Sequence, residues 1–190
     1  MSVIRIEPAA GQLERVNKLL AGFPGGAFKA VYAALKRAGD TAKTKAGQFA
    51  AAQYTISKGT FMSNVNTKSS VSGDMGGAAE LRISYAGSVL PLLAFHTRAS
   101  RNGLVQTQVM RSGGAVTLQH AFIAPVFGQT AVFERVGAPR FPVRQLFGPS
   151  TGHMMQNEQV AEQMSETIQD TFDKRVEHEL LRVLNGWGGR

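Results

Sequence analysis

The chain has no cysteine and few charged residues for its size. The lack of cysteine excludes disulfide frameworks, thiolate metal sites and cysteine nucleophiles. Charged residues make up 18% of the 190 residues, against about 25% in a typical globular domain. No apolar run approaches the roughly 20 residues that a membrane-spanning helix needs, and the N-terminus lacks the apolar core of a signal peptide. The sequence therefore predicts a soluble protein with no membrane partner.

Positive charge is abundant but unevenly distributed. The formal net charge is +8, from 21 Lys and Arg against 13 Asp and Glu. Residues 158–185 alone hold seven acids and three bases, so the rest of the chain is more basic than the total suggests. A basic body favours contact with phosphate or with an acidic protein surface. A surface that is charged only for solubility explains the same composition equally well.

Residues 120–150 (HAFIAPVFGQTAVFERVGAPRFPVRQLFGPS) are the centre of the expected fold. Apolar runs here are separated by Gly–Gln and Gly–Ala–Pro turn signals, which predicts strands over 122–127, 130–136 and 141–147. A hairpin signal precedes them, with strands over 104–110 and 115–121. Shorter strands are expected over 3–7 and 79–85.

Three stretches, at 12–21, 27–52 and 156–185, show the apolar spacing of amphipathic helices. The last has an i,i+4 stripe made of Val160, Met164, Ile168, Phe172, Val176, Leu180 and Leu184. The expected fold class is α+β, with a small, mostly antiparallel sheet packed by the long helix of the N-terminal half and by the long C-terminal helix. The C-terminal helix is expected to lie against the sheet formed by residues 120–150.

Two segments of the expected single domain, which spans residues 1–190, are candidates for contact with neighbouring molecules. Residues 57–79 are polar and glycine-rich, which predicts a mobile loop or a strand with a disordered tip. The hairpin 104–121 is expected to be an arm. Arms of this kind clasp neighbours by adding strands to an exposed sheet edge, and simple disorder is the alternative.

Two catalytic motifs are present only in part. Residues 148–152 match G-x-S-x-G, the nucleophile elbow of serine hydrolases, with Ser150 as the nucleophile. The later acids and histidines lie next to Ser150 or on the one remaining helix, so a turn with a capping Ser150 or Thr151 is the preferred interpretation. His178 begins an H-E-x-x-H pattern, but Arg182 stands where the second zinc ligand belongs. We expect no enzyme activity, no metal and no cofactor.

The basic residues are the stronger functional signal. Candidates for a DNA-facing surface are Lys36, Arg37, Lys43, Lys45, Arg98, Arg101 and Arg111. Base-stacking aromatics are not interleaved with them, so their spacing favours non-specific contact with the phosphate backbone over base reading. A solvated helix face and loop explain the same residues equally well.

Several segments together resemble one protein family. They are ALKRAGDTAKTKA at 34–46, YTISK at 54–58, HAFIAPV at 120–126, VFERVG at 132–137, RFPVRQLFGPS at 140–150 and HELLRVL at 178–184. In this order the chain resembles the prophage minor tail protein Z family of long-tailed phages. The similarity runs along nearly the whole chain, is most specific over 120–126, 132–137 and 140–150, and is loosest over 57–115.

The resemblance implies a structural virion protein that completes the tail at or near the head–tail junction. It implies a fold like that of head–tail connector and tail-completion proteins, with copies forming a ring, expected to be a hexamer, around the channel that phage DNA crosses. The implied neighbours are tail-tube, terminator or connector proteins, and the implied location is the virion, after assembly in the host cytoplasm. The alternatives are a stand-alone, non-specific DNA-binding protein and an assembly factor that is absent from the mature virion.

Overall fold

The structure is a computed structural model that describes residues 2–73, 79–100, 102–126 and 128–186. The chain divides into two compact units. The first, which we call the helical unit, contains Ser2–Ala46, Thr67–Tyr85 and Ala161–Arg190; the second, the small-sheet unit, contains Met1, Gly47–Asn66 and Ala86–Val160. The sequence predicts one domain over 1–190.

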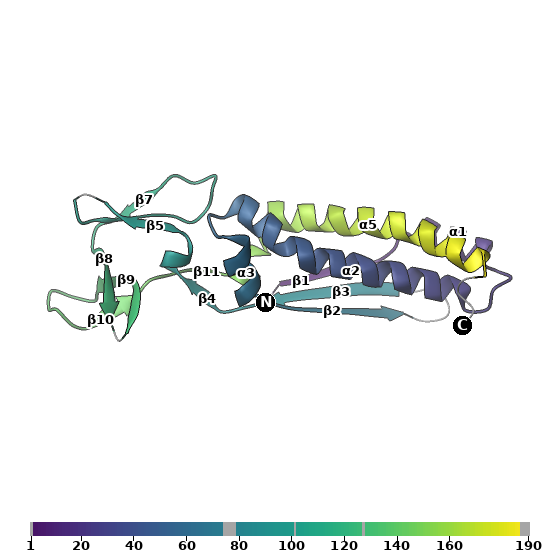
Figure 1. Ribbon diagram of the computed structural model, residues 1–190, viewed down its shortest axis with the longest axis horizontal. Coiled ribbons are helices and arrows are strands. Elements are labelled where there is room, and N and C mark those ends of the chain that lie inside the picture. The colour runs from purple at the N-terminus through teal and green to yellow at the C-terminus, as the bar shows by residue number, and fades with distance from the viewer. Residues whose placement is uncertain (1, 74–78, 101, 127, 187–190) are drawn as a thin grey trace. The chain divides into compact units, whose positions relative to one another are not determined.

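Helices and strands together confirm the predicted α+β class (Figure 1). The helices are α1 (Ala10–Leu19), α2 (Gly26–Gln53), α3 (Lys58–Asn64), α4 (Thr151–Met154) and α5 (Glu158–Leu184), with a 3-10 turn at Leu92–Ala94. The strands are β1 (Ser2–Ile6), β2 (Asn66–Gly73), β3 (Ala79–Ala86), β4 (Val89–Pro91), β5 (His96–Ala99), β6 (Val105–Gln108), β7 (Val116–Leu118), β8 (Ala121–Val126), β9 (Gln129–Arg135), β10 (Val143–Gln145) and β11 (Phe147–Ser150).

The sheet of the helical unit has the strand order β1-β3-β2, with β1 antiparallel to β3. Side chains alternate along β3, so Leu81, Ile83 and Tyr85 point to one face and are fully buried. The phenol of Tyr85 lies 3.9 Å from the sulfur of Met164 on α5. Burial raises the pKa of Tyr85 well above its ordinary value, because the charged phenolate would lose its hydration.

Within the helical unit, α2 and α5 run antiparallel and α1 lies along α5 (Figure 1). Gln12 of α1 donates to Asp173 at 2.6 Å, and Arg15 pairs with Glu177 at 2.7 Å. The α5 stripe predicted from the sequence is buried from Val160 to Leu180, but Leu184 is exposed. The i,i+4 spacing of apolar residues therefore predicts the buried face of α5 correctly, except in the last turn of the helix.

Small residues dominate the buried face of α2. They are Ala30, Ala34, Ala38, Gly39, Ala42, Ala46, Gly47 and Ala50. A methyl group added at Gly39 would lie 3.1 Å from Leu81 Cδ1, so this glycine allows β3 to approach the helix backbone closely. Alanine favours helix and has almost no side-chain entropy to lose. The small residues up to Ala46 thus explain the close packing of α2 in the helical unit, while Gly47 and Ala50 belong to the small-sheet unit.

The small-sheet unit is built from three antiparallel sheets, with the orders β10-β9-β8, β5-β6-β7 and β11-β4. The hairpin β6–β7 and the strands β8 and β9 form close to where the sequence predicts them. The strand predicted over 141–147 is shorter, as β10, and Phe147–Ser150 forms β11, which pairs with β4 in a different sheet. The core of this unit contains Leu92, Val105, Ala121 and Val132, with Leu93, Val109, Leu118, Ile123 and Leu146 packed against it.

Two predictions about the chain's organisation were wrong. The mobile loop predicted over 57–79 contains α3 and then β2, so the alternative, a strand, is the correct one for 66–73; residues 74–78 lie outside the described part. Ser57 begins α3 by accepting a hydrogen bond from the amide of Thr60, a cap that the polar composition concealed. The C-terminal helix was expected to pack on the 120–150 sheet, but from Ala161 onward it belongs to the unit built on β1-β3-β2.

The tip of the 104–121 hairpin is bound to the end of α2. The amide of Thr55 donates to the carbonyl of Val109, and the amide of Arg111 donates to the carbonyl of Gln53 at 2.8 Å. Tyr54 also forms an antiparallel bridge with Met110. The hairpin predicted as an arm is therefore held down at its turn.

Candidate interaction surface

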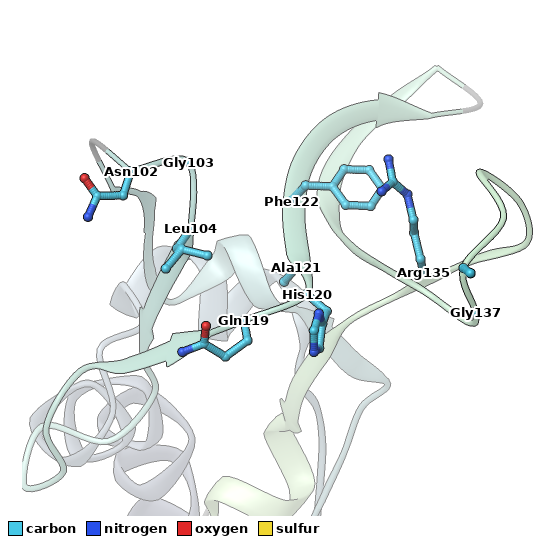
Figure 2. Close-up of a pocket in the computed structure, with 10 residues that line it drawn as sticks. Asn102, Gly103, Leu104, Gln119, His120, Ala121, Phe122, Arg135 and Gly137 are labelled. Carbon is cyan, nitrogen blue, oxygen red and sulfur yellow. The ribbon is translucent and has the colours of Figure 1, made fainter.

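The β8–β9 hairpin positions an arginine against an aromatic ring. Gly128, with φ of +80°, permits the tight turn between the paired residues Val126 and Gln129. The resulting register places Phe122 opposite Phe133, with ring centroids 6.2 Å apart. Side chains two residues apart in a strand share a face, so Arg135 lies on the same face as Phe133. Its guanidinium carbon is 5.6 Å from the centroid of the Phe122 ring (Figure 2).

A second arginine–aromatic pair lies in the connection between β9 and β10, residues 136–142, which we call the β9–β10 loop. The guanidinium carbon of Arg140 is 5.6 Å from the ring centroid of Phe141. The peptide bond before Pro142 is cis, and the amide of Val136 donates to the Pro142 carbonyl at 3.1 Å. Every residue of the loop is exposed, including Val136 at 62% and Phe141 at 55%.

A pocket of about 660 Å³ opens beside these strands (Figure 2). Its walls are Asn102, Gly103, Leu104, Gln119, His120, Ala121, Phe122, Arg135, Gly137 and Ala138. The neighbouring carboxylate, Glu134, points to the other face of β9 and pairs with Arg144 at 2.7 Å. Arg135 therefore gives the described pocket walls their positive charge.

The predicted basic residues of α2 lie on the helical unit. Lys36, Arg37 and Lys45 are exposed and Lys43 is half-buried. Asp40 lies between Lys36 and Lys43 on the helix and comes within 3.7 Å of the Lys43 ammonium group. This carboxylate weakens the attraction of that face for phosphate, an effect that counting bases alone does not reveal.

The predicted basic residues of the hairpin region do not form one group. Arg98 is exposed on β5, and Arg101 lies outside the described residues. The Arg111 side chain instead donates from Nε to the carbonyl of Ala51 at 2.8 Å. The last four carbonyls of a helix lack intrahelical partners, and a cation there also favours the helix dipole. The contact of Arg111 is thus with the C-terminus of α2.

The nucleophile-elbow candidate, Ser150, has a capping contact. Its hydroxyl accepts a hydrogen bond from the amide of His153 at 3.1 Å and begins α4. Thr151 is fully buried, and its hydroxyl donates to the carbonyls of Asn64 and Ala86, each at 3.4 Å. The capping interpretation of Ser150 is therefore confirmed.

Neither a metal-binding group nor a membrane-spanning helix is found in the part of the chain that the structure describes. No three His, Asp or Glu side chains there come together as a metal site, and His178 lies beside only Glu179, at 3.9 Å. No helix among those residues combines the length and apolar character needed to cross a bilayer.

The arginine–aromatic pairs were missed by reasoning from the sequence, although the signal is present. The sequence FERVGAPRF over 133–141 interleaves two arginines with two phenylalanines. Only the strand register and the turn show that Arg135 meets Phe122, 13 positions earlier in the chain, while Arg140 meets its own neighbour.

Comparison with known proteins gives no match for this chain. Protein-family models, curated proteins and solved structures were all compared, and none is similar enough to report.

Proposed function

We propose that the chain is a structural protein of a long-tailed phage that completes the tail at or near the head–tail junction. It would act as one subunit of a homo-oligomeric ring, expected to be sixfold, around the channel that DNA crosses. Its neighbours there would be tail-tube, terminator or connector proteins. The resemblance over 120–126, 132–137 and 140–150 supports this proposal.

The observation that carries the proposal is the exposed β9–β10 loop. Val136 and Phe141 stand more than half exposed, and Arg140 covers one side of the Phe141 ring. Aromatic residues and arginine are enriched at protein–protein interfaces and supply most of their binding hot spots. Burying exposed apolar surface contributes a favourable free energy of about 25 cal/mol per Å². This loop therefore has the composition of a surface that becomes buried on assembly.

Purified particles provide the direct test. Mass spectrometry of virions should detect the chain in a fixed, low copy number, and negative-stain images of particles assembled without it should show unjoined heads and tails. Absence from mature particles together with a requirement for their assembly would identify an assembly factor. If particles form and infect normally without the chain, the proposal is wrong.

A matched pair of variants tests the loop itself. Phe141→Asp should leave the fold intact, because the ring is exposed, yet should fail to restore joined particles in a complementation assay. Val116→Asp is the control, since Val116 on β7 is equally exposed, at 58%, but lies outside the β9–β10 loop. Equal complementation by both variants would contradict a role for the loop.

Non-specific DNA binding is a second candidate, favoured by the exposure of Lys36 and Arg37 on α2. It predicts salt-sensitive DNA binding by the isolated chain, because cationic side chains release counterions from the phosphate backbone. Replacing Lys36, Arg37, Lys43 and Lys45 with glutamine should abolish that binding. Lack of binding at low salt would exclude this function.

A further inference from the structure

We propose that the pocket beside β8 and β9 binds an acidic group, a carboxylate or a phosphate, through the guanidinium of Arg135, with His120 as a further lining residue. This site lies outside the basic residues that the sequence singled out, and it does not depend on the proposed place of the chain in a phage particle. Its ligand class follows from charge, geometry and size.

The charge of the pocket is one-sided. The part of the sequence that forms the small-sheet unit has seven Lys and Arg against two acids, Glu134 and Glu158. Glu134 is engaged by Arg144, and none of the residues described as lining the pocket has a carboxylate. Among the described residues, Arg135 has a cation–π contact with Phe122 and no ion pair. Its positive charge is thus available to a ligand.

The geometry prepares Arg135 for an oxyanion. A guanidinium that packs against a ring keeps its planar fork in one orientation, and the N–H donors at its edge stay free. Such a fork matches the two oxygens of a carboxylate or phosphate, and less conformational entropy is lost when it binds. Phe122 is itself fixed by its contact with the buried ring of Phe133.

A second basic side chain, His120, lines the same pocket. Ala121, the first residue of β8, pairs with Glu134; His120 lies in the turn just before β8, Arg135 is the last residue of β9, and both line the pocket (Figure 2). The amides of Asn102 and Gln119 add neutral hydrogen-bonding groups to the wall. The described wall therefore has several hydrogen-bonding side chains and no carboxylate.

The size of the pocket indicates an acidic group attached to a larger molecule. Small-molecule sites commonly measure about 300–1,000 Å³, and this one measures about 660 Å³. A single phosphate would fill only part of it. An acidic peptide side chain and a phosphorylated small molecule share the required chemistry, so the experiment needs one probe for each.

An NMR titration of the isotope-labelled full chain tests the site at low ionic strength. The probes are sodium phosphate and hexaglutamate. We expect the Arg135 side-chain Nε–H and the His120 ring signals to shift saturably with at least one of them. A response to phosphate alone would indicate a phosphorylated ligand, and stronger binding of hexaglutamate would indicate an acidic peptide. No saturable shift with either probe would overturn the proposal.

Variants separate a built site from general attraction to positive charge. Arg135→Gln should weaken binding about tenfold or more, and Arg135→Lys, which keeps the charge but lacks the fork, should weaken it several-fold. Arg140→Gln is the matched control: Arg140 also packs over a phenylalanine but does not line the pocket. Equal losses in the Arg135→Gln and Arg140→Gln variants, or full binding by Arg135→Lys, would refute the site. Arg135, Arg140 and Phe141 are exposed, and Phe122 is half-buried. The backbone amide spectrum should therefore show that each variant folds.

Discussion

The two units bury their apolar side chains in different ways. In the helical unit, long helices present regular stripes to one sheet, and fully buried residues follow one another every turn along α5. In the small-sheet unit, three- to seven-residue strands of the three sheets enclose a smaller core. Both units leave some large apolar side chains exposed, and in the small-sheet unit two of them, Val136 and Phe141, lie in the β9–β10 loop. The difference indicates that the core of the helical unit depends on long, regular apolar stripes, whereas the core of the small-sheet unit depends on contacts between short strands. Four predictions test this comparison, in order of decreasing effect.

The largest difference in the free energy of unfolding is expected between two phenylalanine-to-alanine variants. Phe172→Ala on α5 should lower the free energy of unfolding by about 3–5 kcal/mol, because the ring is fully buried and its loss leaves a cavity. Phe141→Ala in the β9–β10 loop should change it by less than about 0.5 kcal/mol. Urea denaturation followed by circular dichroism measures both. Similar losses for the two variants would contradict the division between the units.

Gly87 tests how tightly the small-sheet unit is packed where its chain segments meet. A methyl group there would lie 2.5 Å from the Asn64 carbonyl and would overlap the Thr151 hydroxyl. Gly87→Ala should therefore lower the unfolding free energy by about 1–3 kcal/mol. Gly114→Ala is the control, since nothing lies within 4 Å of its added methyl group. A neutral Gly87→Ala would show that this junction is looser than the structure indicates.

Arg111 tests whether a predicted DNA contact is instead a structural one. Arg111→Met should lower the unfolding free energy by about 1 kcal/mol, because the Ala51 carbonyl loses its donor and the end of α2 loses a cation. Arg98→Met, on an exposed strand position, should leave stability unchanged. Thermal unfolding compares the two. A larger effect of Arg98→Met would contradict the assignment.

Alkaline pH should have the smallest effect, and it should involve the helical unit through Tyr85. The folded-state pKa of Tyr85 is raised by burial, so folding favours the protonated phenol. The contribution of the protonated Tyr85 to the free energy of unfolding is complete below about pH 10. It falls as the pH rises further, because only the unfolded chain releases the phenol proton readily. The loss at about pH 10.5 should be under about 1 kcal/mol. Tyr85→Phe should reduce this loss, although Tyr54, whose pKa burial also raises, retains a share.

How far the sequence predicts this fold depends on where each segment finds its partners. The stripe of α5 and the alternation of β3 follow local periodicity, and both predictions are confirmed. Residues 58–73 look like a polar loop because α3 is short and depends on the Ser57 cap, while β2 gains its structure from pairing in the β1-β3-β2 sheet. Such partners are distant in the chain and leave little local signal.

The contacts of the candidate site are also only partly predictable from the sequence. The hairpin strands, the turn at Gly128 and the interleaved arginines and phenylalanines are all visible in the sequence. The sequence does not show which arginine contacts which ring, because a shift of one residue in the strand register would move Arg135 to the opposite face of the sheet. Nor does the sequence show that Arg111, grouped with the DNA candidates by charge, caps α2.

By itself, the sequence determined the α+β class, the long helices and the meander of 120–150, because these depend on periodicity and turn residues within short windows. Only the tertiary structure decided which sheet the C-terminal helix belongs with, that the hairpin turn is bound to the end of α2, and that Arg135, Phe122 and His120 line one pocket. The physical reason is that each of these depends on contacts between residues far apart in the chain. Local propensity does not encode such contacts.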